Sequence, residues 1–78
     1  MGTLETLAAK LAEDTIKVQK ETGQDRLFVE VGNILAAASQ SLEEAYLTEM
    51  RVRMAEEKAR KFLIQKVKET RAAAGSPE

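Results

Sequence analysis

Apolar residues recur along the chain at intervals of three and four, a spacing that predicts amphipathic helices. The first helix is expected over about residues 4–22. Its apolar stripe consists of Leu4, Leu7, Ala8, Leu11, Thr15 and Val18. Ile16 lies off this stripe, so it is either incidentally exposed or part of a second contact surface. Thr3 is placed to cap the start of the helix, and Gly23 to end it in the left-handed conformation.

A second helix is expected over about residues 25–39, although residues 27–31 leave two interpretations open. Leu-Phe-Val-Glu-Val is rich in β-branched and aromatic residues and is compatible with a strand. A lone strand would have no partner in this chain, which favours a helix with Asp25 as its N-cap. The helix would gather Leu27, Val31, Ile34, Leu35 and Ala38 on one face. Gly32 costs about 1 kcal/mol inside a helix relative to Ala, which indicates a packing reason for it.

The third predicted helix, about residues 42–73, is long for a chain of 78 residues. Ser41 and Glu44 have the spacing of a capping box at its start. Three pairs of opposite charge lie four residues apart, each worth roughly 0.2 to 0.5 kcal/mol: Glu49 with Arg53, Glu56 with Arg60, and Glu57 with Lys61. Some 30 helical residues span about 45 Å, whereas a compact globule of this size has a radius of gyration of about 11 Å. The helix must therefore project from the fold or find a partner.

The apolar residues of the third helix change face along its length. The first set is Leu42, Tyr46, Met50 and Met54, and the second is Val52, Ala55, Ala59, Phe62, Leu63 and Val67. Two partners in series explain the change: the first half packs on the other two helices and the second half on another chain. The predicted fold is thus all-α, a three-helix domain over residues 1–73 whose bundle is completed by dimerisation, followed by a flexible tail over residues 74–78.

Composition supports dimerisation and argues against catalysis. Of the 34 hydrophobic residues, twelve are alanine, so the core available to one chain is small. Cysteine and histidine are absent, which excludes disulfides, thiolate or imidazole metal sites, and Cys or His catalysis. The adjacent carboxylates Glu43/Glu44 and Glu56/Glu57 diverge around a helix and cannot converge on a substrate. We expect no enzymatic activity, no cofactor and no metal.

Charge separates the two parts of the chain. Residues 51–71 carry eight Lys and Arg against three Asp and Glu, whereas residues 1–50 carry four against nine. Phosphate contacts through Arg51, Arg53, Arg60 and Lys61 are the alternative hypothesis, that of a small nucleic-acid-binding regulator. The cations are spread around the helix and no aromatic residues are interleaved with them, so nucleic acid is the weaker hypothesis. Ribbon-helix-helix and helix-turn-helix arrangements fit the element lengths and the Ser-Gln-Ser break poorly.

The favoured hypothesis is a small helical protein that acts as a homodimeric interaction or regulatory module. Its expected self-association residues are Val52, Ala59, Phe62, Leu63 and Val67. The opposed charges of the two parts of the chain suit antiparallel or head-to-tail pairing. A different protein is the other partner to consider. No segment approaches 18 consecutive apolar residues, so we expect a cytoplasmic protein without a membrane partner.

Overall fold

Three helices and short connections make up the whole of the described chain. The structure is a computed structural model and describes residues 2–75. Helix α1 is Thr3–Thr22, α2 is Leu27–Ala38 and α3 is Gln40–Gly75. This confirms the predicted all-α class, and residues 27–31 are helical rather than a strand. Helix α3 begins two residues earlier than expected and runs two residues further; the rest of the predicted tail, residues 76–78, lies outside the described residues.

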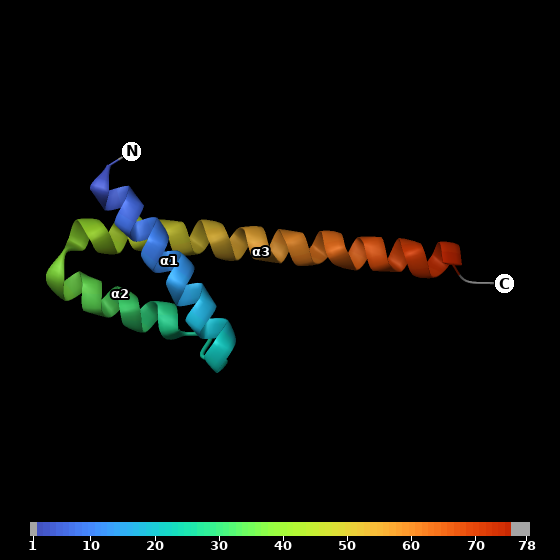
Figure 1. The fold of residues 1–78 in the computed structure, drawn as a ribbon, viewed down its shortest axis with the longest axis horizontal. Helices are drawn as coiled ribbons and strands as arrows, with labels where there is room; N and C mark the ends of the chain where they lie inside the picture. The colour runs from blue at the N-terminus through green and yellow to red at the C-terminus, as the bar shows by residue number, and fades with distance from the viewer. Residues whose placement is uncertain (1, 76–78) are drawn as a thin grey trace.

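Helices α2 and α3 form a hairpin, and α1 crosses over α3 (Figure 1). The second half of α3 continues well beyond the other two helices (Figure 1). The Cα atoms extend over 61 × 29 × 13 Å and have a radius of gyration of 17.2 Å. That radius exceeds the value of about 11 Å for a compact globule of this length, so α3 projects as the sequence predicts.

The core lies where the three helices meet, around Tyr46 and Met50. Both side chains are fully buried, together with Ala8 and Ala12 of α1. Leu42 and Met54 pack against this cluster, so the predicted core face of α3 is confirmed. Ala8 and Ala12 present small side chains at the crossing, which lets the backbones of α1 and α3 approach closely.

The hydroxyl of Tyr46 joins all three helices. It donates a hydrogen bond to the Phe28 carbonyl oxygen on α2, at 3.1 Å, and lies 3.4 Å from the Thr15 hydroxyl on α1. Burial raises the pKa of Tyr46, an effect that the contact with Thr15 opposes. A second polar tie runs between α1 and α2, where the Gln19 side-chain oxygen accepts the Phe28 amide at 2.8 Å. This bond satisfies an amide in the first turn of α2 that has no partner within the helix.

Several details of the apolar faces differ from the prediction. On α1, Ile16 packs against the core, whereas Leu4, Leu7 and Val18 are exposed. Ala8, Leu11 and Thr15 of the predicted stripe do face the core, so the buried line of α1 is rotated from the prediction by about a sixth of a turn. The helix meets α3 along the line of its small residues. On α2, Ile34 is 70% exposed, so it does not share the buried face that was predicted for it.

The helix ends also correct the predicted caps. Thr3 is the first residue of α1 and the N-cap is Gly2, which makes no side-chain bond. The N-cap of α2 is Arg26 rather than Asp25. At α3, Ser39 replaces the predicted Ser41 capping box, since its hydroxyl accepts the Leu42 amide at 3.2 Å.

Of the two glycines that stand out in the sequence, the structure explains one. Gly23 ends α1 with φ of 73°, the left-handed conformation that was predicted. Gly32 is buried against α3, but the space around it does not require a glycine, so the predicted packing reason is not found. A Cβ atom at Gly32 would lie 3.5 Å from the Leu47 Cδ2 atom and 3.8 Å from the Tyr46 Cε2 atom, both ordinary contact distances.

Candidate protein interaction surface

The distal part of α3 exposes its side chains on every side. We call residues 58–75 the arm and residues 2–57 the body. All residues from Lys58 to Ala73 are exposed. Just before the arm, Glu57 forms an ion pair with Lys20 of α1, at 2.9 Å. Among the described residues, this is the last polar contact that joins α3 to another helix. That pair replaces the Glu57–Lys61 pair predicted from spacing.

Large apolar side chains are exposed along this arm and just before it. Val52 is 62% exposed, Phe62 61%, Leu63 60%, and Ile64 and Val67 about half. Monomeric proteins rarely leave a contiguous apolar surface of this kind uncovered, so the face is a candidate interaction site. Ile64 belongs to this set and was missing from the predicted residues.

The predicted self-association residues lie on the side of α3 that is turned away from the core. Ala59 follows Met50 by nine residues, which at 3.6 residues per turn places the two on opposite sides of the helix. Val52, Ala55 and Ala59 lie along this side of the helix, and all three are exposed. We call this side the outer face of α3. Thr48, also exposed, extends the same line toward the start of α3. The sequence could have indicated this position of Thr48, because residues four apart lie on the same side of a helix and Thr48 precedes Val52 by four.

Phe62 and Leu63 flank this outer line on its two sides. The Lys66 amine lies 5.7 Å from the centre of the Phe62 ring, a cation–π contact within the arm. Beyond Leu63, the apolar side chains drift around the helix toward Ile64 and Val67. A shallow depression of about 310 Å³ there is lined by Arg60, Leu63, Ile64, Val67, Lys68 and Arg71. Apolar contact area and positive charge thus occur together on the arm.

The four candidate phosphate contacts do not form one site. Arg53 is bound to Glu49 at 3.3 Å and Arg60 to Glu56, through a nitrogen–oxygen distance of 2.8 Å, as spacing predicted. Lys61 lies near Lys20 and Lys58 in a separate depression between α1 and α3. Arg51 lines another, beside Phe28 of α2. The structure therefore distributes these cations over different sides of α3.

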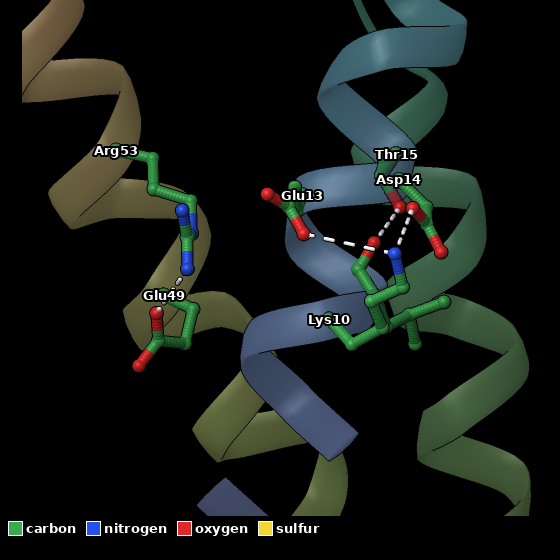
Figure 2. Close-up of polar contacts among 7 residues, drawn as sticks. Lys10, Glu13, Asp14, Thr15, Glu49 and Arg53 are labelled. Atoms are coloured by element: carbon green, nitrogen blue, oxygen red, sulfur yellow. Dashed lines mark hydrogen bonds and ion pairs between the residues drawn. The ribbon is translucent and has the colours of Figure 1, made fainter. Parts of the chain in front are cut away.

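A groove between α1 and α3 opens beside Val52. Its volume is about 460 Å³, and it is lined by Glu13, Ile16, Glu49, Val52, Arg53, Glu56 and Glu57. Figure 2 shows Glu13 on the side of α1 that faces Glu49 and Arg53 of α3. On the neighbouring part of α1, Lys10 pairs with Asp14 at 3.3 Å, and the Asp14 side chain lies at the surface (Figure 2). The groove itself was not foreseen, because it depends on how α1 crosses α3.

The described residues show neither a metal site nor a membrane span. No group of three or more acidic side chains in residues 2–75 is arranged to hold a metal ion. No described helix combines the length and the apolar character needed to cross a bilayer. Comparisons with protein-family models, with curated proteins and with solved structures find no match.

Proposed function

We propose that this chain is a non-enzymatic interaction module that associates with itself through the outer face of α3. The single observation that supports this most strongly is the exposure of Val52, Phe62 and Leu63 on a helix that extends beyond its own fold. An isolated helix of the arm's length is marginal in water, since most helical stability in proteins comes from packing of an apolar face. A second chain supplies that packing.

Ion pairs within α3 support the arm locally but do not replace a partner. Glu56 with Arg60 and Lys66 with Glu69 at 3.6 Å are exposed pairs between successive turns. Each such pair contributes only a few tenths of a kcal/mol. Covering one large apolar side chain contributes roughly 1.5 to 3 kcal/mol, so burial of the outer face dominates.

The experiment compares two substitutions of exposed apolar residues by aspartate. Phe62→Asp places a charge in the proposed interface, whereas Ile34→Asp places one on α2, away from α3's outer face. We expect sedimentation equilibrium at micromolar concentration to give a dimer for the native chain and for Ile34→Asp. Phe62→Asp is expected to be monomeric and to lose the helical circular dichroism contributed by the arm.

Two results would overturn this proposal. One is a compact, stable monomer for the native chain over the whole concentration range. The other is an unchanged dimer for Phe62→Asp, which would move the interface away from the arm. Titration of the native chain with duplex and single-stranded nucleic acid at low salt belongs to the same experiment. Tight binding by a monomer, weakening steeply with salt, would favour the nucleic-acid hypothesis instead.

A further inference from the structure

The arm and the body carry opposite charges of equal size. The arm contains six basic residues and one acidic residue, a formal charge of +5. The body contains six basic and eleven acidic residues, a formal charge of −5. Two arms lying against one another would therefore repel, whereas an arm lying against the body of a second copy would be attracted.

The groove between α1 and α3 has the composition needed to receive such an arm. Four of its lining residues are glutamates and one is Arg53, while Ile16 and Val52 supply apolar surface. The Nε atom of Arg53 is buried and makes no hydrogen bond within the described residues. Each of the four glutamates already forms an ion pair within its own chain, with Lys10, Arg53, Arg60 or Lys20. The groove thus combines a lining of net negative charge, apolar contact area and an unmet donor, beside the exposed outer face of α3.

We propose that this groove is the docking site for the arm of a second copy, with the two α3 helices antiparallel. This inference rests on the proposed self-association and adds the site and the direction of pairing. When Leu63 of one copy lies opposite Val52 of the other, the opposed chain directions place Lys66 opposite Glu49. The same alignment sets the large Phe62 near the small Ala55. Large side chains then meet small ones, and cations meet carboxylates.

Two-fold symmetry turns the side of the arm that carries Arg60 and Val67 toward the groove of the partner. A two-fold rotation that relates antiparallel helices keeps corresponding sides of both helices on the same side of the dimer. Val67 follows Glu49 by eighteen residues, which is five full turns, and Arg60 follows Arg53 by about two turns. Glu49 and Arg53 line the groove, so Val67 and Arg60 project on the same side of α3 and face the partner's groove.

Parallel pairing lacks these features. It would place Phe62 beside Phe62 and Lys66 beside Lys66, and it would align two segments that each carry a charge of +5. It would also leave the groove uncovered. The observations therefore favour the antiparallel arrangement, in which each copy both donates an arm and accepts one.

Charge reversal on the two sides of the docking site provides the first test. Glu13 is an exposed residue of α1, and its only ion pair among residues 2–75 is the long one to Lys10, at 3.8 Å, so we expect Glu13→Lys to keep the fold. We expect Glu13→Lys and Arg60→Glu each to weaken the dimer about tenfold, because a favourable contact becomes a repulsive one at two symmetric places. Glu30→Lys makes the same charge change on the exposed surface of α2 and should have no effect.

An equimolar mixture of the two reversed variants is the decisive sample. In a mixed dimer, residue 13 of each chain meets residue 60 of the other. One of these two contacts keeps the native Glu13 and Arg60, and the other pairs the two substituted residues, which again have opposite charges. We therefore expect near-native affinity for the mixture. Failure of the mixture to recover, with each variant alone weakened, would overturn the docking geometry. An unweakened Glu13→Lys dimer would do the same, since the groove would then lie outside the interface.

Cross-linking gives a second test, because the chain contains no cysteine. Val52→Cys and Leu63→Cys chains are mixed and oxidised under mild conditions. We expect disulfides mainly between one Val52→Cys and one Leu63→Cys chain. Predominant Leu63→Cys homodimers would place the two arms against one another, overturning the groove while keeping self-association through α3. A native chain that sediments as a monomer would overturn both the groove and the proposed function.

Discussion

The hydroxyl of Tyr46 makes a stability contribution that can be separated from that of its ring. Tyr46→Phe keeps the buried ring and removes the hydrogen bond of 3.1 Å to the Phe28 carbonyl. The two groups that contact the Tyr46 hydroxyl keep other partners in this variant. The Thr15 hydroxyl still donates to the Leu11 carbonyl oxygen at 2.8 Å. The Phe28 carbonyl oxygen still accepts the backbone amide four residues further along its helix. We therefore expect a loss of about 1 kcal/mol, the value of a net hydrogen bond without a stranded group.

Two companion variants make the prediction sharper. Tyr46→Ala also removes the ring and should cost about 3 to 5 kcal/mol, as in other truncations of buried aromatic residues. Thr15→Val should show a small coupling to Tyr46→Phe in a double-mutant cycle, about 0.5 kcal/mol, because the two hydroxyls are in contact but at the long distance of 3.4 Å. The free energy of unfolding would be measured by urea denaturation followed by circular dichroism, at one protein concentration, since association shifts apparent stability. A neutral or stabilising Tyr46→Phe would refute the idea that the hydroxyl holds the three helices together.

Three further predictions concern single positions. Gly32→Ala should stabilise the fold by up to about 1 kcal/mol in urea denaturation, because a Cβ atom there meets its neighbours at ordinary distances and Ala favours a helix; a destabilised variant would show that α2 cannot accept even a methyl group. Gly23→Ala should destabilise the fold by about 1 kcal/mol in the same assay, since φ is 73°; equal stability would contradict the left-handed end of α1. Burial raises the pKa of Tyr46, so the folded state favours the neutral phenol over the tyrosinate. The resulting contribution to the free energy of unfolding should be complete below the ordinary tyrosine pKa of about 10, and it should be lost as pH rises through the higher pKa of the folded protein. Tyrosinate absorbance reports this residue alone because the chain has one tyrosine, and a pKa at or below the ordinary value would refute the effect of burial.

The core face of α3 was predictable, whereas the contact line of α1 was not. Tyr46, Met50 and Met54 are large and lie four residues apart, whereas the opposite side of the same turns offers only the smaller Thr48, Val52 and Ala55. On α1, Leu7 and Ala8 compete for the interior, and a hydrophobicity pattern favours the leucine. The buried residue is Ala8, because the crossing of two helices selects small side chains at the point of closest approach.

Contacts between elements likewise escaped the local pattern. Spacing within one helix predicted the pairs of Arg53 and Arg60 correctly. It assigned Glu57 to Lys61, while the structure offers it Lys20 from α1. The bond from Gln19 that satisfies the first turn of α2 has no sequence signature, because it depends on where the end of α1 lies relative to α2.

By itself, the sequence determined the helical class, the length of α3, its two apolar faces and the lack of cysteine and histidine side chains. These are local properties, set by periodicity, composition and the reach of 1.5 Å per helical residue. Only the tertiary structure decided which face of α1 is buried, and that the crossing of α1 over α3 forms an acidic groove beside an exposed apolar face. The groove brings together Glu13 and Val52, residues far apart in the chain, and no pattern along a single helix contains that information.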